Sequence, residues 1–203
     1  RLAALGKQLP AQRADGAHAA AGHRILRDHG LRVIRVVGGT MAEPETVKRA
    51  GIQAQRIQHP LLCGYYGEHN LGDDALLEAL VQQLPADWQP VVTAYDRPQI
   101  EARHGLPTVD RRRLRDVLKA LRGCDALVLG GGSLLQDSTS LRSLIYYAAL
   151  IGAARMQGKP VLLWGQGLGP LKRAISRAIV RQLLPLTSGI SWRDPDSRTL
   201  AES

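Results

Sequence analysis

The 203-residue sequence has no phenylalanine, two cysteines, and no apolar run long enough to cross a bilayer. Without phenylalanine, a core must be built mainly from Leu, Ile, Val and Ala, and the apolar fraction of 44% is sufficient for one. The missing apolar run argues against a transmembrane helix. Two isolated cysteines make neither a disulfide framework nor a CxxC metal site. We therefore expect Cys63 and Cys124 to be reduced, buried thiols.

The chain also lacks a starting methionine and an apolar leader, so we expect it to begin inside a longer reading frame. Residues 1–58 hold ten Lys and Arg against four Asp and Glu, which is six units of the net charge of +9. Apart from one candidate strand at 31–37, they show little periodicity. We predict a basic extension over 1–58 and one domain over 59–203. Elsewhere the tightest basic cluster, Arg111–Arg113, is expected on the solvated face of a helix, and no nucleic-acid partner is expected.

From Pro60 onward, short apolar runs alternate with amphipathic segments. Such alternation predicts an α/β fold with a parallel, Rossmann-like sheet flanked by helices. Ligands of these sheets bind at the carboxyl ends of the strands, where three glycine-rich loops fall, at 64–72, 130–133 and 165–169. The predicted strands are 61–66, 90–95, 125–129, 161–164 and 189–192, and the predicted helices are 73–84, 111–121, 141–157, 171–184 and one beginning at 195.

The second glycine loop has the character of an anion site. Consecutive glycines let backbone N–H groups approach a ligand, and the helix that follows adds partial positive charge. Ser133 supplies a hydroxyl, and Arg142 supplies a cation in the first helical turn. In the first loop, Asp73 stands either as a helix N-cap or as an acid that deprotonates a sugar hydroxyl. Asn70 either braces the loop or binds substrate.

Several familiar sites are excluded by spacing. No Lys follows the glycines as a Walker loop requires, and no Gly-x-Gly-x-x-Gly follows the first strand of the alternating region. The Gly-x-Ser-x-Gly elbow of serine hydrolases is missing, and no His pair has metal-ligand spacing.

Four ordered motifs resemble those of the polysaccharide pyruvyl transferase family. The resemblance covers about residues 60–203. The motifs are Gly64-Tyr65-Tyr66-Gly67-x-x-Asn70-x-Gly72-Asp73, Gly130-Gly131-Gly132-Ser133-Leu134-Leu135-Gln136-Asp137-x-Thr139-Ser140-x-Arg142, Gly165-Gln166-Gly167-Leu168-Gly169-Pro170 and Trp192-Arg193-Asp194-x-x-Ser197.

The resemblance implies a two-domain fold like that of GT-B glycosyltransferases, with this chain as its N-terminal domain and the second domain missing. It implies transfer of pyruvate from phosphoenolpyruvate to a lipid-linked or polymeric sugar of the cell wall or capsule, as a ketal. The closest branch serves the anchoring of surface-layer proteins. No cofactor or metal is implied. The protein would lie in the cytoplasm or at the inner face of the cell membrane, and a homo-oligomer is left open. Because half of the cleft would be absent, we expect these 203 residues alone to be inactive or nearly so.

Two alternatives remain open beside this transferase: a binding-only domain, and a GT-B glycosyltransferase that uses a nucleotide sugar. The resemblance gives Asp73 and Arg142 catalytic roles. The expected substrate-binding residues are Asn70, Gly131, Gly132, Ser133, Gln136, Asp137, Thr139, Ser140, Gln166 and Gly167.

Overall fold

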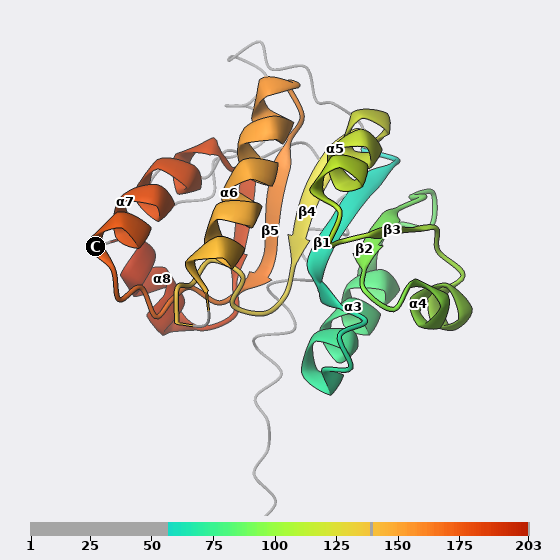
Figure 1. Ribbon diagram of the computed structural model, residues 1–203, viewed down its shortest axis with the longest axis horizontal. Coiled ribbons are helices and arrows are strands. Elements are labelled where there is room, and N and C mark those ends of the chain that lie inside the picture. The colour runs from blue at the N-terminus through green and yellow to red at the C-terminus, as the bar shows by residue number, and fades with distance from the viewer. Residues whose placement is uncertain (1–56, 139, 203) are drawn as a thin grey trace, which may run out of the picture.

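The structure is a computed structural model that describes residues 57–138 and 140–202. Within them, parallel strands alternate with helices (Figure 1). The elements are β1 (Pro60–Tyr66), α3 (Leu71–Gln83), β2 (Val91–Ala94), α4 (Arg97–His104), β3 (Thr108–Asp110), α5 (Leu114–Gly123), β4 (Ala126–Gly130), α6 (Leu141–Met156), β5 (Val161–Gln166), α7 (Ala174–Leu183), a 3-10 turn (Leu184–Leu186), β6 (Gly189–Trp192) and α8 (Pro195–Glu202).

The six strands form one parallel sheet in the order β3-β2-β1-β4-β5-β6. The chain builds outward from β1 to β3, then returns to the middle and builds outward the other way from β4 to β6. The order therefore reverses between β1 and β4. In doubly wound sheets this reversal opens a crevice at the carboxyl ends of the two central strands, where ligands bind. The α/β, Rossmann-like class predicted from the sequence is confirmed.

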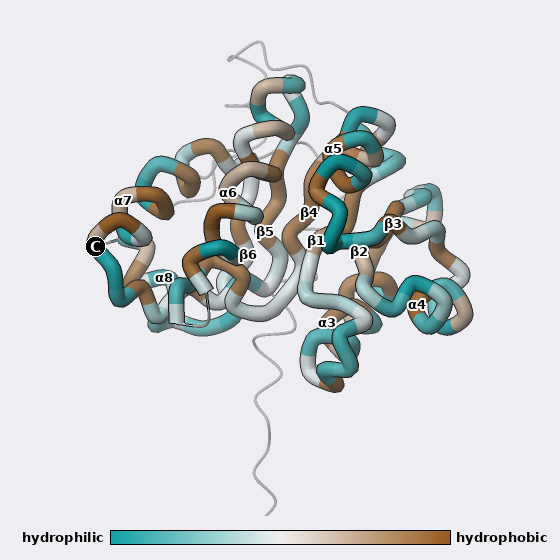
Figure 2. The backbone as a smooth tube through the Cα atoms, in the orientation of Figure 1, coloured by the Kyte–Doolittle hydropathy of each residue, from teal (hydrophilic) through white to brown (hydrophobic). Residues whose placement is uncertain are grey.

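Two hydrophobic cores cover the two faces of the sheet. Successive strand residues point to opposite faces, so Leu61 packs in one core and Leu62 in the other, both fully buried. Helices α5, α6 and α7 cover the first face, and α3 and α4 contribute to the second. In Figure 2 the strands are largely hydrophobic, as expected for a sheet buried on both sides.

Some boundaries differ from the prediction. The pair α4 and β3 was not predicted, since α4 buries one apolar side chain, Ile100, and β3 has three residues. Helix α5 begins at Leu114 rather than near Arg111, and it ends at Gly123, with Cys124 as the C-cap. The candidate strand at 31–37 lies outside the described residues, and the domain boundary at residue 59 stays a prediction.

Both cysteines are buried and free, as predicted. Burial raises the pKa of the Cys63 thiol to about 12, so the thiol stays protonated and behaves as an apolar group. In the described part of the chain, no helix combines the length and apolar character needed to cross a membrane.

Candidate active site

Tyr66, at the end of β1, joins the two central strands. Its ring passes under Gly64, where an added Cβ would lie 2.2 Å from the ring atom Cζ. Its hydroxyl donates to the carbonyl of Gly130 at the end of β4. An added Cβ at Gly130 would meet that same hydroxyl at 2.5 Å. These two glycines are therefore required by an aromatic side chain that fixes the strand ends, rather than by a ligand.

The loop after β1 is held by side chains of α3. Asn70 is the N-cap of α3, and its Oδ1 accepts from the Gly72 N–H at 3.0 Å. The side-chain amide of Asn70 donates to Asp73 at 2.6 Å. The next residue, Asp74, is buried and accepts from the Gly67 N–H at 3.0 Å. The prediction that Asp73 stands at the N-cap was wrong, because Asn70 takes that position. Asp73 lies in the first turn of α3, with its carboxylate beside the second glycine loop.

The loop after β4 faces Asp73. Gly131 and Gly132 have φ of 70° and 73°, a left-handed backbone that other residues adopt at a cost. The Gly131 N–H donates to the carbonyl of Trp164 at 2.7 Å. The N–H groups of Gly132 and Ser133 donate to nothing in the described part of the chain. A Cβ on Gly132 would lie 3.0 Å from Oδ1 of Asp73, so the carboxylate and the two available N–H groups are neighbours.

The loops after β5 and β6 close the site from the other side. Gln166 is fully buried and donates to the Gly132 carbonyl at 2.9 Å, and the Gly167 N–H donates to that same oxygen at 2.9 Å. Arg193 follows β6, and its Nη2 donates to Oγ of Ser133 at 3.0 Å. A Cβ at Gly167 would lie 2.5 Å from Nη2 of Arg193. Glycine at position 167 therefore makes room for the cation to reach Ser133.

Asp137 connects the segment after β4 to the segment that precedes α7. Its two carboxylate oxygens accept from the N–H groups of Lys172 and Arg173, each at 2.8 Å. These hydrogen bonds lower the pKa of Asp137 to about 2. Asp194 plays a similar part at the start of α8, where it accepts from the Ser197 N–H at 2.7 Å. Both carboxylates are thus committed to backbone amides of their own chain, and this arrangement holds the loops in place.

A cluster of aromatic and charged side chains flanks the first loop. Arg111 pairs with Glu68, and its guanidinium lies 4.3 Å from the ring centre of Tyr65. The side chains of Arg111 and Glu68 are 11% and 10% exposed, so the pair is largely shielded from water. Arg112 also contacts Glu68, at 3.2 Å. The prediction that this arginine run lies on a solvated helix face was wrong, because the run precedes α5 and two of its members, Arg111 and Arg112, bind Glu68 in the loop after β1.

The electrostatic setting of Asp73 follows from these neighbours. Burial and the adjacent Asp74 raise the pKa of Asp73 above its usual value, while Arg111 and Arg193 oppose that rise. A carboxyl group with a raised pKa accepts a proton more readily than an ordinary aspartate does. Asp73 is therefore suited to take a proton from a hydroxyl bound against the Gly132 loop.

The remaining residues predicted to bind substrate or act in catalysis make no hydrogen bond or ion pair with Asp73, Gly132 or Ser133 within the described part of the chain. Ser140 is the N-cap of α6, and its Oγ accepts from the Arg142 N–H at 3.1 Å. The Arg142 side chain is exposed and has no ion-pair partner among residues 57–138 and 140–202. Gln136 is half-buried and accepts from the Ser138 hydroxyl. Thr139 lies outside the described residues. The sequence motif Arg193-Asp194 was noted, but its spacing did not predict that Arg193 reaches Ser133, and Glu68 was not singled out.

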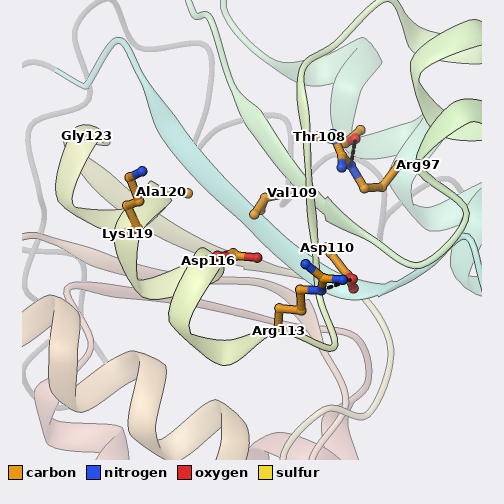
Figure 3. A pocket seen from close by; sticks show the side chains of 9 residues that line it. All are labelled: Arg97, Thr108, Val109, Asp110, Arg113, Asp116, Lys119, Ala120 and Gly123. Carbon is orange, nitrogen blue, oxygen red and sulfur yellow. Dashed lines mark hydrogen bonds and ion pairs between the residues drawn. The ribbon is translucent and has the colours of Figure 1, made fainter.

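A surface hollow of about 580 Å³ lies elsewhere, along the edge strand β3 (Figure 3). Arg113 pairs with Asp110 at one side of it, and Arg97 bonds to Thr108 at another. The hollow shares no residue with the four loops. It is lined by Arg97, Thr108, Val109, Asp110, Arg113, Asp116, Lys119, Ala120 and Gly123.

The fold is a doubly wound α/β domain, and its loops gather two available N–H groups, the Arg193 guanidinium and the Asp73 carboxylate at the carboxyl edge of the sheet. The sequence of residues 70–203 matches the model of the polysaccharide pyruvyl transferase family, so the chain belongs to that family. The match indicates a transferase that acts on polysaccharide. A comparison with curated proteins found no matching relative.

Proposed function

We propose that the loops at the β1/β4 reversal bind phosphoenolpyruvate and a sugar acceptor, and that the site transfers the pyruvyl group to two sugar hydroxyls as a ketal. One observation carries this proposal. Two available N–H groups, at Gly132 and Ser133, lie beside both a cation and a carboxylate with a raised pKa. Phosphoenolpyruvate bears a phosphate and a carboxylate, which are bound by such N–H groups and by arginine. The family match supports the same reaction.

The reaction balances without an oxidant or reductant. One sugar hydroxyl adds to C2 of phosphoenolpyruvate while the methylene carbon C3 gains a proton and becomes a methyl group. The bond between C2 and the phosphate oxygen then breaks, the second hydroxyl oxygen takes the place of the phosphate on C2, and phosphate leaves with the remaining proton. The product is a cyclic ketal that keeps the pyruvate carboxylate.

Each residue takes a role that its surroundings permit. Asp73 accepts the proton of the attacking hydroxyl, because its pKa is raised and it faces the Gly132 loop. Arg193 and the N–H of Ser133 hold an anionic group of the donor, and Gly167 leaves the space in which Arg193 reaches it. Arg142, exposed in the first turn of α6, supplies a second cation for the same donor. The acceptor is a lipid-linked or polymeric sugar, met at the inner face of the membrane or in the cytoplasm.

Binding to the whole chain tests the donor assignment by isothermal titration calorimetry. Phosphoenolpyruvate should bind, and Arg193→Ala should weaken binding about 10-fold or more, as expected for loss of a charge-assisted hydrogen bond. Arg198→Ala is the matched control, because the Arg198 side chain pairs with Glu202 within α8.

Titration with a nucleotide sugar in place of phosphoenolpyruvate distinguishes a pyruvyl transferase from a glycosyltransferase. Binding of a nucleoside diphosphate sugar without binding of phosphoenolpyruvate would contradict the proposal and favour a glycosyltransferase. Phosphate release from bound phosphoenolpyruvate when a sugar acceptor is added would contradict the binding-only reading.

A further inference from the structure

One long stretch in the second half of the chain carries positive charge and no negative charge. Residues 138–193 contain eight Lys and Arg and no Asp or Glu. Acidic residues number 18 in the whole chain, so a stretch this long without one departs from the overall composition. It comprises α6, β5, α7 and β6. The two strands lie in the sheet beneath the helices, so the surface without acidic residues is formed mainly by α6 and α7.

The outward face of α6 is mainly apolar, with the exposed Arg142 at its start. Ile145, Ala149, Gly152 and Met156 follow one another at spacings of four, three and four residues, which places them on one helix face. Ile145 is 50% exposed and Met156 is 91% exposed. The opposite face supplies the buried residues of the helix, among them Leu150 and Ile151. Helix α6 thus presents apolar side chains to solvent as well as to the core.

Helix α7 lies beside α6 (Figure 1). Its inner face is buried through Val180 and Leu183, which pack in the same core as α6. Its exposed side includes Ile175, which is 56% exposed. The exposed cations along and just before α7 are Lys172, Arg173, Arg177 and Arg181.

We propose that the joined outer surface of α6 and α7 docks onto an anionic lipid bilayer. Apolar side chains on α6 and Ile175 on α7 enter the boundary between headgroups and acyl chains, and the cations of α7 contact lipid phosphates. Such a surface, apolar in one stripe and basic beside it, is the pattern of proteins that lie on membranes without crossing them. Figure 2 shows the contrast between α6, where hydrophobic colours prevail, and α7, where the two kinds alternate.

Charge argues against the two other occupants of an apolar, basic surface. A second copy of the chain, paired through a two-fold axis, would bring like charges together, since residues 138–193 offer no acidic group. A nucleic acid would gain from aromatic side chains on which bases stack. Neither the outward stripe of α6 nor the exposed side of α7 carries one among its described residues.

Sedimentation with lipid vesicles tests the proposal on the whole chain. The protein should bind vesicles of phosphatidylcholine with roughly 30% phosphatidylglycerol, and bind vesicles of phosphatidylcholine alone at least about 10-fold more weakly. Lys172→Gln with Arg177→Gln should lower affinity about 25-fold, from roughly fivefold for each cation near the surface. Arg115→Gln with Lys119→Gln on α5 removes the same charge from another exposed helix and should leave binding unchanged.

The apolar contribution needs its own pair of variants. Ile145→Gln with Met156→Gln should lower vesicle affinity about 10-fold, because two apolar side chains no longer leave water. Both side chains are at least half exposed, so circular dichroism and melting should be unchanged. Leu114→Gln, on α5 at 37% exposure, is the control for an apolar change elsewhere.

Three outcomes would overturn the proposal. The first is equal affinity for both kinds of vesicle. The second is a dimer in sedimentation velocity that the α6 variant converts to a monomer, which would assign the surface to a second copy. The third is tight binding of single-stranded RNA with no effect of the α6 variant, which would assign it to a polyanion. Calorimetry with phosphoenolpyruvate is run in parallel, because its result tests the proposed reaction independently of vesicle binding.

Discussion

Replacing Gly167 with alanine should separate donor binding from folding. The new Cβ would lie 2.5 Å from Nη2 of Arg193 and 2.6 Å from Oγ of Ser133, both closer than side chains tolerate. Both contacts are ends of side chains that can rotate away, so the backbone stays in place. Arg193 would lose its position on Ser133, and the anion site would lose its best-placed cation.

The expected magnitudes differ for the two properties. Loss of a charge-assisted hydrogen bond to the donor costs about 1.5–3 kcal/mol, which lowers affinity for phosphoenolpyruvate roughly 10- to 150-fold. The free energy of unfolding should change by less than about 1 kcal/mol. The reason is that the lost hydrogen bond between Arg193 and Ser133 is offset by the smaller entropy of an unfolded chain with alanine in place of glycine.

Calorimetry and urea denaturation measure these two effects, with Gly165→Ala as the matched control. Gly165 has φ of 55° and nothing within 4 Å of an added Cβ. Alanine there is strained and should cost about 1–2 kcal/mol of stability, with no effect on phosphoenolpyruvate affinity. The reasoning is refuted if Gly167→Ala keeps normal affinity, or if Gly165→Ala weakens binding as much.

Further predictions concern the groups that surround this site. Asp73→Asn should raise the melting temperature at neutral pH, because a raised pKa means that the ionised carboxylate destabilises the folded protein. That gain should disappear as the pH falls below 3.8, where the carboxyl group is protonated in both states; calorimetric scans against pH measure it. Asp137→Asn should do the opposite, lowering the melting temperature at neutral pH. Its effect should shrink as the pH falls from 3.8 through about 2, where the native carboxylate is protonated. Arg111→Ala should cost about 2 kcal/mol in urea denaturation, since it removes the shielded partner of Glu68 and leaves the more exposed Arg112 as its remaining cation. Adding Glu68→Gln should recover part of that loss, whereas additive effects would mean that the pair is not coupled. Tyr66→Phe should cost about 1–2 kcal/mol, and an unchanged urea midpoint would show that its hydroxyl contact is unimportant.

Much of the fold was predictable because its signals are local. Apolar runs such as Leu127–Leu129, followed by a glycine, and Val161–Leu163, preceded by a proline, alternate with helices, and alternation alone predicts a parallel sheet. Helix α4 lacked such a signal, since its hydrophobic contact with the core depends on Ile100 alone. Strand β3 has three residues and is defined by its pairing with β2, and no local pattern in the sequence predicts that pairing.

The site was predictable at the level of its loops and less so at the level of contacts. Glycine loops after strands indicate the edge where ligands bind, and the structure brings Asp73, Gly132, Ser133 and Gly167 together there. The N-cap was misplaced by three residues, although Asn is itself a favoured capping residue and precedes the acidic first turn. The role of Arg111 depends on its meeting Glu68, 43 residues away, which requires knowing the strand order.

The Tyr66 ring has a consequence for how sequences of this fold vary. It occupies the space of two absent side chains, at Gly64 on its own strand and at Gly130 on the neighbour. The three positions are therefore one packing unit with a shared volume. A library that randomises all three together should return folded proteins with a side chain at 64 only when position 66 becomes small, and with one at 130 only when Leu80 also moves aside. The glycines at these two positions would then be inherited as partners of a tyrosine, and would change with it.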